Sequence, residues 1–120
     1  MDMELKKAFT EMQVNKLETT KKIRILDVQI DSLKKQKQRY ELTSKEVGNL
    51  NDSAKVYSAV GRMFVMSSVP VIREELKQKQ EKVGKVVESC DKSKNILINN
   101  LSGQENHLRE LVENKKKEAK

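Results

Sequence analysis

The sequence is short of the residues from which compact cores are usually built. It has no tryptophan, two phenylalanines and two tyrosines among its 120 residues, and only 36% of the residues are apolar. So few bulky side chains suit thin helical seams surrounded by solvated charge better than a globular core. Because proline occurs once and glycine four times, long stretches are free of helix breakers. We expect a single, mainly α-helical domain over residues 1–120.

Groups that carry out catalysis or bind metals are equally scarce. The chain has one cysteine, Cys90, and one histidine, His107, so no internal disulfide and no pair of metal-binding histidines can form. A glycine-rich phosphate-binding loop is absent as well. We therefore expect no enzymatic activity, no metal and no cofactor. Cys90 is interpreted as a small buried apolar group on a helical seam, with a redox role as the alternative.

No apolar stretch approaches the roughly 20 residues that a membrane span requires. The first four residues do not have the layout of a signal peptide, and a lone cysteine fits a reducing compartment. These features predict a cytoplasmic protein that does not bind membranes.

The net charge of +7 is spread along the chain. Most lysines stand among glutamates and aspartates at spacings typical of solvated helix faces. The one tight basic run, Lys115–Lys117, matches the dipole at a helix C-terminus, and we favour that interpretation over a phosphate-binding tail. A nucleic-acid partner is not expected, since there is no clustered basic face with stacking aromatics.

Apolar residues recur at alternating spacings of three and four in both halves of the chain, as they do in coiled coils. The first seam comprises Leu5, Phe9, Met12, Lys16, Thr19, Ile23, Leu26, Ile30, Leu33, Lys37 and Tyr40. The second comprises Ile72, Leu76, Lys79, Val83, Val87, Cys90, Lys94, Leu97, Leu101, Gln104, Leu108 and Leu111. Two successive spacings of four predict a stutter at Val83–Val87, which locally unwinds a supercoil. We expect helices at 1–42 and 69–120 to pack antiparallel as a coiled-coil arm.

The segment 43–68 between these helices is predicted to contain a short helix and a β-hairpin. The first long helix should end near Tyr40, and Thr43–Glu46 is a capping box that would open the short helix. The second long helix should start near Ser68. Gly84 and Gly103 weaken it, which leaves open either a bend or flexible outer arm, or supercoil contacts that override the low helix propensity of glycine.

The hairpin is predicted from short runs of β-branched, aromatic and other apolar residues around a turn. Val56–Val60 and Met63–Met66 are the expected strands, and Gly61–Arg62 joins them. Because side chains alternate between faces of a strand, both faces of the second strand are apolar. A lone hairpin is marginal and its edges invite pairing. We therefore expect an assembly element whose subunit contacts are Val56, Tyr57, Val60, Gly61, Met63, Phe64, Val65 and Met66.

The run from Tyr57 through Val60-Gly61-Arg62-Met63-Phe64 resembles the hairpin motif of β-class prefoldin subunits, and the layout of helices resembles that family along nearly the whole chain. The resemblance implies a prefoldin-like fold and a hetero-hexamer of two α-class and four β-class subunits. It also implies a nucleotide-independent co-chaperone that captures unfolded or nascent proteins, notably actin and tubulin, and passes them to the cytosolic chaperonin.

Capture of unfolded chains requires apolar groups that are not fully buried in the free protein. Both ends of the chain provide such groups, and methionine suits varied partners because it is flexible and polarisable. The candidate client contacts are Met3, Leu5, Phe9, Met12, Leu108, Leu111 and Val112. Several of them also occupy seam positions, so pairing between the helices is the alternative role for each. The rival function for the whole chain is a structural or tethering coiled coil, which would not require a strand segment with two apolar faces.

Overall fold

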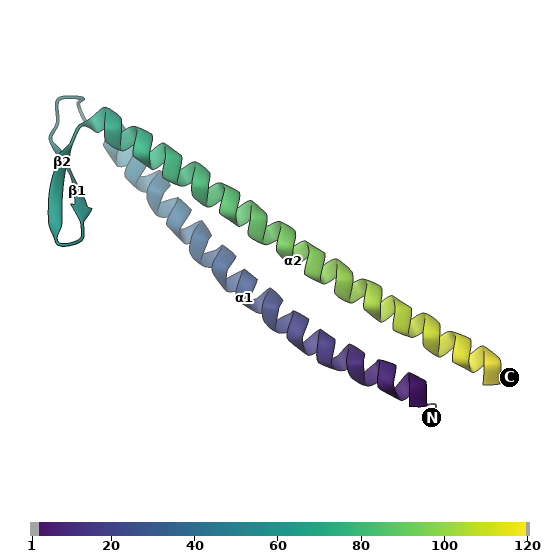
Figure 1. Cartoon of the computed structure of the whole chain (residues 1–120). Coiled ribbons are helices and arrows are strands. Elements are labelled where there is room, and N and C mark those ends of the chain that lie inside the picture. Colours follow the sequence, from purple (N-terminus) through teal and green to yellow (C-terminus); the bar gives the residue numbers. More distant parts are fainter. Residues whose placement is uncertain (1–2, 120) are drawn as a thin grey trace. The chain divides into compact units, whose positions relative to one another are not determined.

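The computed structural model describes residues 3–119, which form two long helices and one β-hairpin. The elements are α1 (Met3–Gly48), β1 (Val56–Val60), β2 (Met63–Ser67) and α2 (Val69–Ala119) (Figure 1). The chain divides into two compact units. We call residues 30–89 the hairpin unit, and residues 3–29 with 90–119 the terminal unit. The predicted fold class, two long helices with a central β-hairpin, is confirmed.

The end of α1 differs from the prediction. The helix does not stop near Tyr40 and restart at Thr43; it continues to Gly48. The Thr43 hydroxyl donates to the carbonyl oxygen of Arg39 at 2.8 Å, as threonine does inside a helix, instead of capping a new one. Continuity is favoured because Val47, in the last turn, is buried and this packing overrides the local capping signal.

The hairpin unit contains a small apolar core. Val47 from α1 packs with Val69, Ile72 and Leu76 from α2. Tyr40, Ala54 and Val56 pack against this cluster. Val69 is fully buried at 0% exposure, so the first turn of α2 is fixed directly behind the hairpin.

The start of α2 follows the prediction. Pro70 lies in its first turn, where a missing amide donor is tolerated, and the amide of Ile72 donates to the carbonyl of Ser68 at 3.1 Å. The helix then continues through both Gly84 and Gly103. Neither glycine ends the helix, and a bend or flexible outer arm at these positions stays a prediction.

The seams are largely where the sequence places them, with four exceptions. Phe9 and Lys16 in α1 and Lys79 and Gln104 in α2 are exposed. In each case the neighbouring residue is the less exposed one: Ala8, Asn15, Gln80 and Glu105. The reason is that a helix with 3.6 residues per turn drifts against a strict 3.5-residue pattern.

These shifts also move the predicted stutter. With Gln80 in the seam, the spacing around Val83 and Val87 is regular. Two successive spacings of four occur instead around Thr19 in α1, and around Leu76 and Leu101 in α2. Thr19 and Leu101 belong to the terminal unit and Leu76 to the hairpin unit, so the departure from supercoil geometry that a stutter causes is expected in both units.

Candidate interaction surfaces: the β-hairpin and the helix ends

The β-hairpin is a two-stranded antiparallel sheet with a two-residue turn. Tyr57 pairs with Met66, Ala59 with Phe64, and Val60 with Met63. Gly61 has a φ of +61° and no non-glycine residue among those described has a positive φ. Glycine with positive φ at the first turn position is the pattern of a type II′ turn, whose twist matches that of paired strands. A Cβ at this position would meet nothing within 4 Å, so Gly61 is required by conformation and not by close packing.

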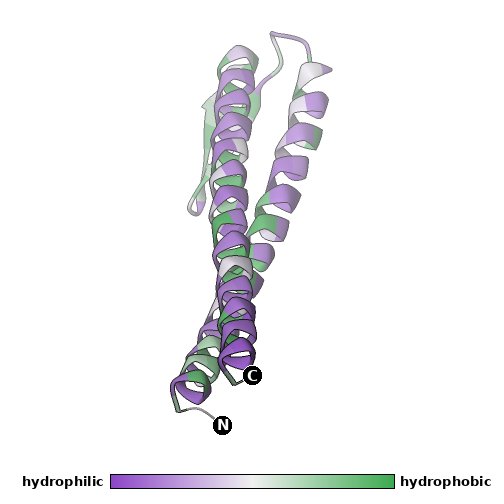
Figure 2. Cartoon of the chain, turned by 90° about the vertical axis from the view of Figure 1, so that its right-hand side faces the viewer, coloured by the Kyte–Doolittle hydropathy of each residue, from purple (hydrophilic) through white to green (hydrophobic). Residues whose placement is uncertain are grey.

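Both faces of the hairpin are apolar and exposed to solvent in the single chain. The register places Val60, Met63 and Val65 on one face, and Tyr57, Phe64 and Met66 on the other. All six are exposed, Phe64 most of all at 75%. Figure 2 shows the two strands as mainly hydrophobic beside largely hydrophilic helices. A surface of this kind marks an interaction site.

Arg73 from α2 holds the loop that leads into the hairpin. Its guanidinium donates to the Asp52 carboxylate at 3.0 Å and to the carbonyls of Leu50 at 3.2 Å and Gly48 at 3.5 Å. The carbonyls satisfied here include one at the C-terminal end of α1, where helical partners run out. Val56 reaches the apolar cluster, so the base of the hairpin is fixed while its faces stay open.

The terminal unit contains the beginning of α1 and the end of α2. Met3 is 79% exposed and Phe9 is 51% exposed. The other five candidate client contacts, Leu5, Met12, Leu108, Leu111 and Val112, are half-buried. A groove of about 500 Å³ is lined by Phe9, Leu108 and Val112 together with Arg109, Glu113 and Lys116. The structure thus brings candidates from both helices together around one apolar groove with charged borders.

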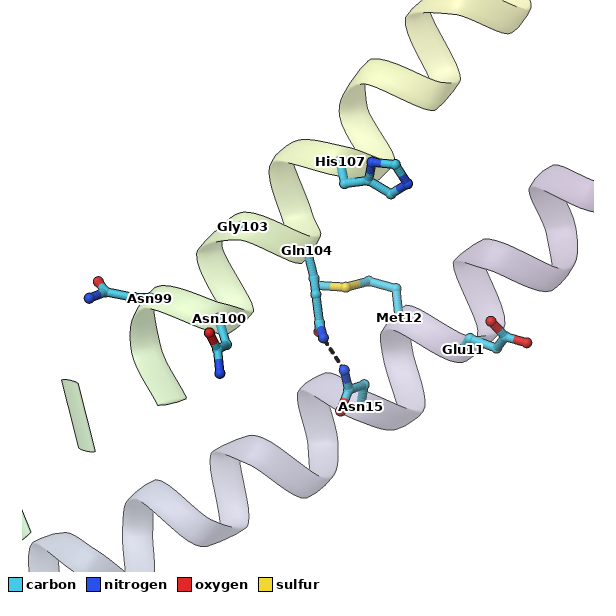
Figure 3. A pocket seen from close by; sticks show the side chains of 8 residues that line it. All are labelled: Glu11, Met12, Asn15, Asn99, Asn100, Gly103, Gln104 and His107. Atoms are coloured by element: carbon cyan, nitrogen blue, oxygen red, sulfur yellow. Dashed lines mark hydrogen bonds between the residues drawn. The ribbon is translucent and has the colours of Figure 1, made fainter. Parts of the chain in front are cut away.

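A second hollow, of about 550 Å³, interrupts the seam with polar groups. Figure 3 shows Met12 and Asn15 of α1 facing Gln104 of α2, with a hydrogen bond from the Asn15 amide to the Gln104 oxygen. Gly103 contributes no side chain to fill the space. An apolar seam would exclude water here, so this polar layer is a weak point in the packing of the terminal unit.

Charged pairs join the two helices along the terminal unit. Glu4 pairs with Lys115 at 3.2 Å, Lys16 with Glu105 at 3.4 Å, and Asp27 with Lys94 at 2.6 Å. Residue numbers fall along α2 as they rise along α1, which confirms the antiparallel direction. The hydrogen bond from Lys94 to Asp27, with the negative charge of that carboxylate, raises the pKa of Lys94.

The described residues offer little for catalysis. Residues 3–119 contain no cluster of three or more histidine, cysteine or acidic side chains able to hold a metal ion. Within the same range neither helix is long and apolar enough to cross a membrane. Cys90 lies on the seam as expected, but it is half-buried and not buried.

Sequence reasoning missed two of these features. The Arg73 contacts join residues more than twenty positions apart, and no local sequence motif predicts them. The Asn15–Gln104 layer was missed because the seam was drawn through Lys16; following the polar residue that neighbours it would have found the pair.

Comparison with known proteins agrees with this architecture. The family model described as "Prefoldin subunit" matches residues 10–115. The chain therefore belongs to the prefoldin subunit family. It is 35% identical to mouse "Prefoldin subunit 1" over 93% of this chain and 92% of the relative. The corresponding human protein is 34% identical with the same coverage, and "Probable prefoldin subunit 1" of Caenorhabditis elegans is 34% identical over 96% of this chain and 98% of the relative.

A solved structure supports the fold independently. The prefoldin beta subunit from Thermococcus strain KS-1 superposes with a TM-score of 0.75, covering 92% of this chain and 93% of that one, at 15% identity. Prefoldin subunits are non-enzymatic chaperone subunits that assemble with other prefoldin subunits, and family membership gives this chain the same general role.

Proposed function

We propose that residues 1–120 act as one β-class domain in a hetero-hexamer with two α-class subunits and other β-class subunits. The observation that carries the proposal is the hairpin, whose six large apolar side chains are exposed on both faces. Partner hairpins would pair with its open strand edges and cover these faces. The eight predicted interface residues, from Val56 to Met66, all belong to this hairpin or its turn.

We further propose that the complex captures unfolded or nascent proteins without ATP, among them actin and tubulin, and delivers them to the cytosolic chaperonin in the cytoplasm. The support is the groove around Phe9, Leu108 and Val112 and the exposure of Met3. Weak seam packing at Asn15–Gln104 would let the half-buried residues Leu5, Met12 and Leu111 contribute when the helix ends separate.

The assembly role is tested with Phe64→Asp. A carboxylate cannot be buried unpaired in an apolar subunit contact, so this variant should keep its helix content by circular dichroism but fail to co-elute with co-expressed partner subunits. Leu42→Asp is the matched control, because Leu42 is also a large exposed apolar residue, at 65%, but lies outside the hairpin. Co-elution of Phe64→Asp at the expected mass of the complex would refute the role of the hairpin.

The client role is tested separately by removing residues 1–12 and 108–120 from the chain. The shortened complex should retain its subunit composition, because the hairpin unit is intact, but should no longer suppress aggregation of unfolded actin. Full suppression by the shortened complex would refute capture by these residues of this subunit and leave the assembly role untouched.

A further inference from the structure

A second apolar stripe runs along α1 in the terminal unit, apart from the seam. Val14, Leu17, Ile25 and Val28 are all large aliphatic residues exposed to solvent, Leu17 by 65% and Val28 by 66%. With Lys21 they are spaced by three, four, four and three positions, so they share one helix face. We call these five residues the outer stripe. It is about 21 Å long at 1.5 Å per residue.

The outer stripe lies on the side of α1 that faces away from α2. Seam residues Thr19, Ile23 and Leu26 are half-buried against α2. At 100° per residue the stripe is centred roughly 180° from them. Pairing within the terminal unit therefore cannot cover it. A helix that only paired with α2 would have a polar outer face, so these four aliphatic residues are unexplained by the fold.

The charged residues beside Leu17 in the stripe are basic. A shallow hollow of about 560 Å³ beside Leu17 is lined also by Lys16, Lys21 and Arg24. Lys21 stands at the centre of the stripe, and neither it nor Arg24 forms a salt bridge with any described residue. By helical position Lys6 lies on the Arg24 side, whereas Glu18 lies on the opposite flank.

We infer that the outer stripe docks an acidic amphipathic helix of a partner protein. Aliphatic residues of the partner at i, i+3, i+4 and i+7 contact Val14, Leu17, Ile25 and Val28, as in other helix-in-groove complexes. Carboxylates on one flank of that helix pair with Lys21 and Arg24. Because Lys21 and Arg24 have no carboxylate partner among the described residues, the docked helix should carry negative charge on the flank that faces them. The position of Glu18 on the other flank favours one orientation of the docked helix.

A membrane surface is a poorer match. Helices that lie in a membrane interface have a broad apolar face rich in large aromatic and leucine side chains. The outer stripe is narrow, contains no aromatic residue, and has a lysine at its centre. The site is also distinct from the groove at Phe9 and Leu108, so it does not depend on client capture.

The experiment uses the full-length chain assembled with its partner subunits and a fluorescein-labelled helical peptide of about 21 residues. The peptide has leucine at the seam positions of three heptads and glutamate at the flanking positions; a second peptide has lysine in place of each glutamate. Binding is measured by fluorescence anisotropy. The acidic peptide should bind, and Leu17→Ser should weaken it by about tenfold, since one buried leucine accounts for roughly that factor. Ile96→Ser, at another exposed aliphatic residue of the terminal unit (59%), should leave binding unchanged.

The charge requirement is tested by reversal. Lys21→Glu with Arg24→Glu should abolish binding of the acidic peptide and create binding of the lysine peptide, whereas Lys82→Glu with Lys85→Glu in the hairpin unit should change neither. Absence of acidic-peptide binding, or equal binding by wild-type and reversed chains, overturns the proposal. Two further results would also overturn the proposal. One is that the complex binds vesicles of anionic phospholipid but not the peptide. The other is that copies of the complex associate with one another through Leu17 and do not bind the peptide.

Discussion

The hairpin unit and the terminal unit are built from the same two helices, yet they differ in how their apolar residues are buried. All six buried apolar residues among those described, Ile30, Val47, Val69, Ile72, Leu76 and Val83, belong to the hairpin unit. In the terminal unit the seam is half-buried, and the polar Asn15–Gln104 pair and exposed ion pairs lie at it or beside it. Under the proposed function, the better-packed unit would hold the assembly surface in place, and the less well packed unit would adapt to varied clients.

The largest expected effect comes from shortening a buried side chain in the better-packed hairpin unit. Leu76→Ala should lower the stability of the hairpin unit by about 2–4 kcal/mol, because it removes a buried side chain and leaves a cavity. Leu97→Ala, at a half-buried seam position of the terminal unit, should cost about half as much. Hydrogen exchange of the assembled complex measures both, as faster exchange near each site. Equal losses would show that the two units do not differ in packing.

A smaller effect is expected at the hairpin turn. Gly61→Val forces a β-branched residue into a positive φ of 61°, which costs about 1–2 kcal/mol. The change should disorder the strands without altering the helices, because no neighbour lies within 4 Å of an added Cβ. Loss of co-elution with partner subunits, with helix content unchanged, is the expected readout. Ala59→Val is the control for side-chain size within the strand.

Replacing the polar Asn15–Gln104 layer should reduce the difference in stability between the two units. Asn15→Leu with Gln104→Leu replaces a hydrogen-bonded pair at the edge of the seam by two leucines that can contact each other between the helices, and should stabilise the terminal unit by about 1 kcal/mol. Exchange of amides 3–29 and 90–119 should then slow, and capture of unfolded actin should weaken if separation of the helix ends contributes to it. Asn99→Leu is the control, since Figure 3 shows Asn99 pointing away from α1. Unchanged exchange in the double variant would mean that the layer is not a weak point.

The smallest effect concerns the Lys94–Asp27 pair. Because the hydrogen bond to Asp27 raises the pKa of Lys94 above its ordinary value of 10.5, the pair contributes its full stabilisation below that value and loses it as the pH rises through the higher pKa of the folded protein. Between pH 7 and pH 9 the terminal unit should therefore show no change in stability from this pair. Hydrogen exchange compared with Lys94→Met checks this, and a difference between the two chains that shrinks in that range would contradict it.

Local signals predicted well wherever the structure is decided locally. Gly61 identified the hairpin turn because only a short two-residue connection fits between two apolar runs, and Pro70 marked the first turn of α2 because its geometry is tolerated there. The Thr43–Glu46 capping box misled because burial of Val47 against α2, a contact remote in sequence, decides whether the helix continues. Seam assignment at Lys16 and Lys79 was wrong by one residue because the strict heptad ignores the cumulative drift of the helix. The Arg73 contacts and the outer stripe depend on which face the fold leaves open, and this is known only once the two helices are paired.

Cys90 offers a practical consequence of the seam. It is the only thiol in the chain and is half-buried in α2 within the terminal unit. The rate of its alkylation by a small maleimide would therefore report, without any engineered label, how often α1 and α2 separate in the terminal unit. A bound client that keeps the two helices together should slow the alkylation of this sulfur. A client that separates the helices should speed it.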